Sequence, residues 1–592
     1  MAELEKRGTF KRPLLDYTSR DFEGILDNML RALPYYIAEW TDHNVTDFGI
    51  ALAEIFAGEM DVLHYYVDAL HNERFPKYAK RDRSVVESMR LIDYELSGPP
   101  PATVDVVFTI PQVLPSDLII PQGTQLETVS DPDFGTVIFE TIEDVTILAG
   151  QLMATVGAKE GETIEEFLAN SNGREFQKYI LDRFPVVEGS TKLFIDEGFG
   201  LDEWTRKDSF VGSTSTSTDF VIERDENGAI TINLGDNVQG KIPDTLAVIQ
   251  AEYRILTTNR GGNFGNVGPD TVTSVISPIT FQGNPIGITV TNPSTATGGG
   301  RGETAQEAKR NGPLSLRRLY RYVSLEDFET GAGEWPGVIF GKAVLRSSYT
   351  SFVTCCDIDV FIVPLGGGLP TTVIKDELKN EYDTYGMAGV VKRVLDPSYT
   401  PIDISANIYV NAGFSLVDTE LLLRQRLDKM FQLSNAIEDE ETGIKIVAKF
   451  DQDVFVSDIL CLLRDISQVD HVDLTKLTRQ PVPNYKLWSG NGFLENIEIG
   501  LNSVVETWEV RFVNDTDFNV TGSVSGFQGS GNTAEGFTAD NGNLSFVFTA
   551  GNIAQGSADY LEIKTSKYNS NIAIDFNEVP EQGFINLTLI SV

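Results

Sequence analysis

The sequence predicts an α+β multidomain protein with an N-terminal helical bundle segment, a β-rich domain, mixed α/β domains and a C-terminal β-sandwich-like appendage. Apolar residues recur at helical spacing through the first hundred positions, and apolar and polar residues alternate from Thr103 onward. Beyond Glu506, Gly, Ser, Asn and Thr separate short alternating runs. Because 592 residues exceed what one hydrophobic core serves, we expect separate regions at residues 1–97, 103–290, 291–400, 401–505 and 506–592.

The first region, residues 1–97, is predicted to be helical and to bind a partner. Thr18 is a good N-cap for a first helix, which Pro34 ends or kinks. A second helix is expected from an N-cap at Thr46 to about Asn72.

This second helix carries an apolar stripe with the spacing of a coiled-coil seam. A helix of about 26 residues is about 39 Å long at 1.5 Å per residue, which is more than a local core needs, so we expect the stripe to meet another chain. An intramolecular antiparallel helical hairpin would use the same stripe and is the alternative. Glu59 interrupts the stripe, whose members are Leu52, Phe56, Leu63, Tyr66 and Leu70.

A third short helix is expected over about residues 83–96, before Ser97-Gly98 and three prolines that mark a domain boundary. Strands separated by Pro, Gly and Asp turns then continue to about Val290. Residues 161–180 interrupt them and are predicted to form a short helical insertion on the surface.

The segment from Leu234 to Val267 contains glycine turns on both sides of a long apolar strand, expected from Leu246 to Leu256. No catalytic group lies among these glycines, so the segment is typical of a scaffold. Tight turns that need positive φ are expected at its glycines. The turn residues that we single out are Gly235, Gly240, Gly261, Gly262 and Gly265.

After Asn292 helices and strands mix, which favours α+β and α/β units. Helices are expected at about 303–311, 313–320 and 324–332, followed by strands at about 339–347 and 352–363. The next unit is predicted to contain a strand at 401–410, a leucine-rich helix, a helix at 454–463 and a strand near 471–474.

Two blocks in this order resemble the baseplate J-like family, the wedge proteins of contractile phage tails. The first is the glycine segment described above. The second, residues 292–338, has an Asn-Pro entry, a glycine run, a Glu-led helix, Pro313, paired arginines and Glu326-Asp327-Phe328. Arg301 departs from the pattern, because an acidic residue is expected after the glycines, and this puts in doubt any contact made through that carboxylate.

The resemblance implies a structural component of the baseplate wedge in the virion, made and assembled in the host cytoplasm. Its implied partners are other copies of itself and other baseplate wedge proteins, with homodimeric contacts inside a six-fold assembly that rearranges on contraction. The N-terminal helices would form a bundle with a partner. Candidates for the contact between wedges are Tyr320, Arg321 and Trp335.

Composition excludes several other classes of function. A formal net charge of −39 repels nucleic acid and anionic membranes. No apolar run approaches the roughly 20 residues that cross a bilayer, so we expect no membrane insertion. The 3 cysteines, two of them adjacent at Cys355-Cys356, cannot build a disulfide framework.

The sequence predicts no enzyme and no cofactor. With 4 histidines in the chain, few catalytic arrangements are available. His64, Asp68 and His71 could share one helix face and bind zinc, but a solvated polar face opposite the apolar stripe explains the same spacing. The glycine run at 298–300 lacks the Gly-Lys-Ser/Thr ending of a phosphate-binding loop, so a structural turn is the preferred interpretation.

The alternative function is a tail-associated glycan-binding adhesin or glycan-degrading enzyme. In that case the β-rich middle is a carbohydrate platform and residues 506–592 form the binding module. Aromatic residues occur in this module, but no Trp lies beyond Trp508, and packing inside strands accounts for most of them.

Overall fold

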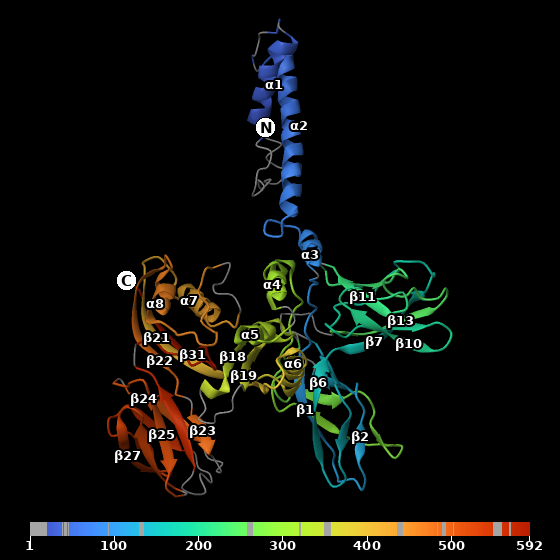
Figure 1. Cartoon of the computed structure of the whole chain (residues 1–592). Coiled ribbons are helices and arrows are strands. Elements are labelled where there is room, and N and C mark those ends of the chain that lie inside the picture. The colour runs from blue at the N-terminus through green and yellow to red at the C-terminus, as the bar shows by residue number, and fades with distance from the viewer. Residues whose placement is uncertain are drawn as a thin grey trace. The chain divides into compact units, whose positions relative to one another are not determined.

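The computed structural model describes residues 20–591 except 38, 41–43, 45, 93, 130–134, 226, 257–264, 319–320, 349–356, 435–441, 482, 488–492, 501, 515, 549–558 and 568–569. The chain forms two compact units (Figure 1). Unit 1 contains Met1–Arg321 with Thr371–Ile374, and unit 2 contains Tyr322–Pro370 with Lys375–Val592. Helices and several separate sheets occur, so the general α+β multidomain prediction is confirmed.

Unit 1 begins with the helices α1 (Phe22–Tyr36), α2 (Phe48–Glu73) and α3 (Asp82–Arg90). The N-caps are aspartates, not the predicted threonines. Asp21 accepts a hydrogen bond from Gly24 N at 3.0 Å, and Asp47 accepts one from Gly49 N at 2.8 Å. A carboxylate also interacts favourably with the positive end of the helix dipole, and this explains the one-residue error at Thr46. Thr18 lies outside the described residues.

The third helix is shorter than predicted and ends at Arg90. The Arg90 side chain binds the segment that follows the helix, because its Nε donates to Glu95 Oε1 at 2.7 Å. Beyond it, Tyr94 Oη donates to Glu303 Oε1 at 2.7 Å. Arg90 Nη2 also donates to Arg224 O at 2.9 Å. The contacts with Arg224 and Glu303 are far apart in sequence, so no local pattern reveals that the chain is not helical where helix was predicted.

Two sheets occupy the middle of unit 1. The first has the order β14-β3-β4-β6-β1-β17, and two strand pairs, β2-β5 and β15-β16, accompany it. Val104, Val106 and Phe108 on β1 are fully buried, as their alternation indicates. The strands are β1 (Thr103–Thr109), β2 (Leu118–Ile120), β3 (Gln125–Thr128), β4 (Ile138–Thr141), β5 (Val145–Ile147), β6 (Met153–Glu160), β14 (Val272–Val275), β15 (Thr280–Phe281), β16 (Asn284–Pro285) and β17 (Thr289–Thr291).

The second sheet has seven strands in the order β7-β13-β9-β10-β11-β12-β8 and its own core around Trp204, Phe220 and Tyr253. The predicted helix at 161–180 is wrong, because these residues form β7 and β8. Strand β7 forms because it pairs antiparallel with β13 along its whole length. This pairing is a long-range contact that the local sequence does not reveal. The strands are β7 (Glu162–Asn170), β8 (Lys178–Ile180), β9 (Lys192–Asp196), β10 (Leu201–Lys207), β11 (Asp219–Arg224), β12 (Ile230–Leu234) and β13 (Val248–Ile255).

Unit 1 closes with α4 (Ala305–Arg318), one helix where two were predicted, with Pro313 inside it. Thr304 and Glu307 cap its start, since Thr304 N donates to Glu307 Oε2 at 2.9 Å and Glu307 N donates to Thr304 Oγ1 at 3.3 Å. Ala305 and Ala308 share a small core with Val85, Val86 and Met89 of α3. The cap and this packing maintain one continuous helix.

Unit 2 begins with a three-stranded sheet in the order β18-β19-β20. Its elements are α5 (Leu325–Glu334), β18 (Val338–Leu345), the 3-10 turn η1 (Arg346–Ser348), β19 (Ile358–Pro364), α6 (Thr372–Tyr385) and β20 (Lys392–Leu395). All seven residues of β19 are buried, as in a central strand. The first part of the strand predicted at 352–363, with Cys355-Cys356, lies outside the described residues.

The second sheet of unit 2 has the order β22-β21-β31. Its elements are β21 (Ser398–Val410), α7 (Leu416–Met430), α8 (Val456–Arg464), β22 (Val469–Arg479) and β31 (Glu578–Ser591). The last strand, β31, runs parallel to β21 and buries Ile585 and Leu587 in the same core as Leu423 and Leu427 of α7. The C-terminal end of the chain therefore returns to the preceding sheet.

Between β22 and β31 two further sheets enclose one aromatic-rich core. They are β23-β30-β25-β26-β27 and β24-β29-β28. This region, residues 483–565, is an insertion, and its limits differ from the predicted boundary at 506. The strands are β23 (Pro483–Leu487), β24 (Leu494–Ile499), β25 (Glu506–Phe512), β26 (Asp517–Gly522), β27 (Gly526–Asn532), β28 (Phe537–Thr538), β29 (Leu544–Phe548) and β30 (Tyr560–Thr565).

An ion pair joins the two ends of this insertion. Arg479 Nη1 lies 2.8 Å from Glu578 Oε2, and both side chains are largely buried. Burial raises the pKa of the Glu578 carboxyl, but Arg479, the Asp575 N–H and Lys564 together outweigh burial and lower it. The carboxylate is therefore held in its charged form where the chain leaves and re-enters the sheet.

Candidate partner interface

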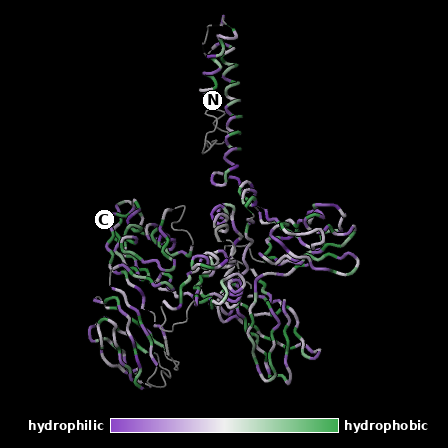
Figure 2. Tube along the Cα trace, in the orientation of Figure 1, coloured by the Kyte–Doolittle hydropathy of each residue, from purple (hydrophilic) through white to green (hydrophobic). Residues whose placement is uncertain are grey.

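Helix α2 exposes the apolar stripe that its sequence spacing predicts. Leu52, Phe56, Leu63, Tyr66 and Leu70 are all exposed to solvent. Phe48, Ile55 and Val62, spaced seven residues apart, are exposed beside them and widen the apolar face. Figure 2 shows hydrophobic positions recurring along α2. The heptad spacing of this second row is readable in the sequence, but its three residues are not among the predicted interface positions.

Helix α1 does not cover the stripe. The two helices pack as a hairpin, with α1 beside the N-terminal half of α2 (Figure 1). The buried residues of α2 are Ile50, Ala57, Asp68 and Asn72. At about 100° per residue they lie roughly half a turn around the helix from the stripe. The two helices therefore form a hairpin, but the prediction that such a hairpin would bury the stripe is wrong.

The face opposite the stripe is consequently not the solvated polar face that was expected. Asp68 is 5% exposed, and its carbonyl accepts a hydrogen bond from Asn72 Nδ2 at 2.9 Å. His64 and His71, the other candidate zinc ligands, are partly buried. Among the described residues no group of three or more His, Cys, Asp or Glu side chains is placed to hold a metal ion.

The three candidates for a contact between wedges differ in their surroundings. Arg321 is exposed in unit 1, and Tyr320 lies outside the described residues. Trp335 is partly buried at the C-cap of α5 in unit 2, where its N–H donates to Ala332 O at 3.1 Å. The Trp335 carbonyl accepts from Val338 N at 3.1 Å. Its backbone therefore shapes the turn between α5 and β18.

The predicted turn glycines are needed for two different reasons. Gly240 and Gly265 have φ angles of 86° and 74°, the left-handed region that favours glycine. Gly235 differs from the expectation, because it is not at positive φ, but a Cβ there would lie 2.4 Å from the Gly240 carbonyl carbon. Gly261 and Gly262 lie outside the described residues.

The glycine run at 298–300 is held as a structural turn. Asn266 Nδ2 donates to Gly299 O at 2.9 Å, and Gly299 N donates back to Asn266 Oδ1 at 2.8 Å. Arg301 Nη2 lies 2.6 Å from Glu307 Oε1, the same carboxylate that caps α4. Polar groups at the start of α4 therefore have their partners within the chain.

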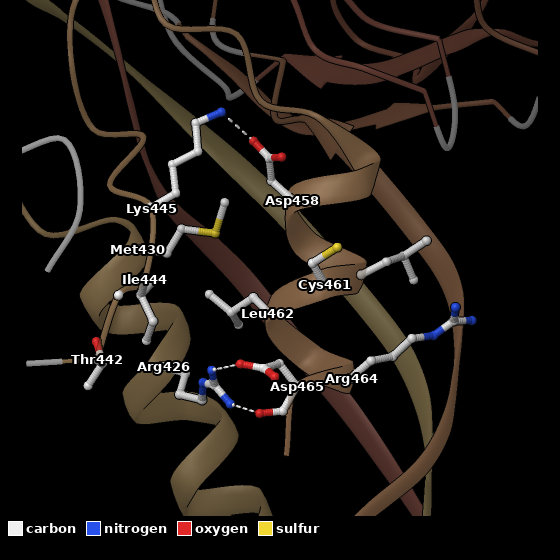
Figure 3. Close-up of a pocket in the computed structure, with 12 residues that line it drawn as sticks. Arg426, Met430, Thr442, Ile444, Lys445, Asp458, Cys461, Leu462, Arg464 and Asp465 are labelled. Carbon is white, nitrogen blue, oxygen red and sulfur yellow. Dashed lines mark hydrogen bonds and ion pairs between the residues drawn. The ribbon is translucent and has the colours of Figure 1, made fainter. Parts of the chain in front are cut away.

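A cavity of about 520 Å³ lies between α7 and α8 in unit 2 (Figure 3). Four of its charged groups form two ion pairs: Lys445 Nζ lies 2.6 Å from Asp458 Oδ2, and Arg426 Nη2 lies 3.0 Å from Asp465 Oδ2. Arg464 Nη2 donates to Val472 O at 3.1 Å. Cys461 lines the cavity, and no described lining residue is a histidine that would activate it.

Most aromatic residues of the inserted region form its core, whereas Phe493 and Phe527 are exposed. Phe512, Phe518 and Phe546 are fully buried, and Trp508 Nε1 donates to Thr565 Oγ1 at 3.0 Å. These buried rings are not presented to solvent. In the described part of the chain no helix is long and apolar enough to span a membrane.

Residues 21–91 match a family described as the N-terminal domain of a bacteriophage baseplate protein. This range contains α1, α2 and α3, and with them the whole stripe. Over 412 residues the chain is 25% identical to baseplate wedge protein gp6 of Enterobacteria phage T4. The alignment covers 64% of this chain and 59% of the phage protein, so less than two thirds of that relative is matched.

Two solved baseplate structures are also similar. A chain of the anti-feeding prophage baseplate aligns with a TM-score of 0.28 and 12% identity, over 78% of this chain and 96% of that one. A chain of the type VI secretion system TssK-TssF-TssG baseplate subcomplex aligns with a TM-score of 0.24 and 10% identity, over 59% and 96%. Since both TM-scores are below 0.5, nothing is inferred from them. By sequence, the chain is similar to structural proteins of bacteriophage baseplates.

Proposed function

We propose that this protein is a baseplate J-like wedge component of a contractile phage tail, without enzymatic activity. It joins other wedge proteins and other copies of itself into the ring between wedges, and it transmits the rearrangement on contraction. The observation that carries the proposal is the apolar face of α2, which stays exposed although α1 packs on the same helix. The match at residues 21–91 supports it, because it covers these helices.

Exposed apolar area of this kind is costly for an isolated chain. Fully burying a Leu or Phe side chain is worth about 1.5–3 kcal/mol. A row of five such positions on one helix, with three more beside it, is typical of a helix that enters a bundle with another chain. Monomeric proteins rarely leave a contiguous apolar surface of this length uncovered.

Glu59 indicates what kind of helix fits the stripe. It is exposed within the row, between Phe56 and Leu63. Two copies of α2 paired in parallel and in register would bring two carboxylates together, which is unfavourable. A helix of another wedge protein that presents Lys or Arg opposite Glu59 would form an ion pair with it. We therefore assign the stripe to binding a different protein and assign self-association to other surfaces.

The test is the mass, by light scattering, of the full chain co-expressed with the neighbouring tail genes. The matched comparison lacks residues 1–78, a deletion that spares α3 and its packing on α4. A defined hetero-oligomer that is lost on deletion is expected. A monomer in both cases would refute the assembly role.

A further inference from the structure

A second exposed apolar patch lies at one end of the seven-stranded sheet. Phe176, Phe199, Val238 and Leu246 all project into solvent from the loops at this end, and we call them the loop-end patch. Hydrogen bonds join the loops: Leu246 N donates to Ser171 O at 2.8 Å, and Phe176 N donates to Gly235 O at 3.4 Å. Asp244 N donates to Glu197 Oε1 at 3.2 Å and ties in the third loop. The four residues therefore lie on loops that are joined to one another.

Two of these residues have a strained backbone without burying their side chains. Phe176 has φ 56° and is 64% exposed, and Leu246 has φ 72° and is 74% exposed. A bulky residue in this region is an outlier that costs about 1–3 kcal/mol. Among the described non-glycine residues at positive φ, these are the only large apolar ones. Neither side chain gains burial within the chain in return for this strain.

The other two residues are held at the tips of built turns. Phe199 is 97% exposed between Gly198 and Gly200, whose N–H groups donate to Asp196 Oδ1 at 2.7 and 3.0 Å. Val238 N donates to Asp236 Oδ1 at 2.9 Å. A side chain whose position is set before binding loses less conformational entropy when a partner covers it.

The surroundings of the loop-end patch are acidic. The three loops, residues 171–177, 196–200 and 235–246, contain five carboxylates and two cations. One cation, Lys241, is already paired with Glu197. Hydrogen bonds from Gly198 and Gly200 lower the pKa of Asp196, and those from Gln239 and Val238 lower that of Asp236. These carboxylates therefore stay charged in mildly acidic conditions.

We propose that the loop-end patch docks a protein whose contact surface combines apolar residues with Lys and Arg. Charge selects this occupant over a second copy, because pairing the loop-end patch with itself would bring two surfaces together that each carry five carboxylates and two cations. The inference rests on the proposed function, since the partner is one of the other structural proteins of the tail. It adds a contact that is separate from α2.

The test measures the affinity of the full chain for each of the other structural proteins of the same tail, purified singly, by titration calorimetry. The variant is Phe176→Asn with Leu246→Asn. It should weaken binding of one basic partner at least about tenfold, from the loss of two apolar contacts. Its unfolding temperature should stay equal or rise, because Asn tolerates positive φ better than Phe or Leu. The matched control is Ile180→Ser, an exposed apolar position on β8 of the same sheet.

Binding that is unchanged in the Asn variant for every tail protein would overturn the inference. So would a variant that loses only the association of the chain with itself. A parallel titration with Phe56→Asp and Leu63→Asp separates the two proposals. If that α2 variant loses a partner and the loop variant loses none, only the loop-end inference fails. If neither loses a partner, the proposed function fails as well.

Discussion

Replacing Phe56 and Leu63 together by Asp should separate the chain from the partner proposed for the stripe without unfolding it. These side chains are 54% and 62% exposed, so roughly half of each is free to be covered by another chain. Full burial is worth about 1.5–3 kcal/mol per side chain, so the lost contact is about 1–2 kcal/mol at each position. An aspartate forced against apolar groups adds the cost of removing its carboxylate from water.

The double variant should therefore bind at least about 100-fold more weakly, since about 1.4 kcal/mol corresponds to a factor of ten. Titration calorimetry with the partner identified by co-expression measures this change. Leu91→Asp is the matched control, because Leu91 follows α3, away from the stripe, and is 87% exposed. The control should bind as tightly as the wild type.

Denaturant unfolding decides whether the effect is on the interface. Because both positions are exposed, the free energy of unfolding should change by no more than about 0.5 kcal/mol. A folded double variant that binds with wild-type affinity would refute the assignment of the stripe. Loss of folding in the double variant alone would show that the stripe packs within the chain.

Three further variants test the fold. Arg479→Met leaves the buried Glu578 carboxylate without its main partner and should lower the free energy of unfolding by about 3–5 kcal/mol. Its control, Arg511→Met, breaks an exposed pair and should lower the free energy of unfolding by less than about 1 kcal/mol. Equal effects of the two variants would contradict the burial argument. Gly235→Ala places its Cβ against backbone and should destabilise the protein more than Gly287→Ala, which has open space and no positive φ, in the same unfolding measurement. Replacing residues 483–565 by a short linker should keep the β22-β21-β31 sheet folded and wedge assembly intact, as judged by circular dichroism and light scattering, and loss of assembly would assign the insertion to an interface.

The replacement of residues 483–565 by a linker is based on the order of the strands, which the sequence did not reveal. The change in composition near residue 506 is real, but it lies inside the insertion and does not mark its ends. A truncation at 505 would remove β31 and with it Ile585 and Leu587, which are part of another core. It would unfold a domain and not simply remove an appendage.

Long-range contacts also explain the other differences. Residues 162–170 contain alternation that fits a strand, but their acidic and small residues suit a surface helix equally well, and only pairing with β13 decides. The end of α3 depends on contacts of Arg90 and Tyr94 with distant residues. At Thr46 the sequence offered two adjacent capping residues, and local geometry selected Asp47.

The sequence by itself determined the α+β composition, the apolar stripe of α2 and the acidic charge that disfavours nucleic acid, because each depends on residue type and spacing along the chain. Only the tertiary structure decided which face of α2 the first helix covers, that β31 returns to β21, and that three loops distant in sequence carry exposed apolar residues at one end of the same sheet. These depend on contacts between residues far apart in the chain, which local periodicity does not encode.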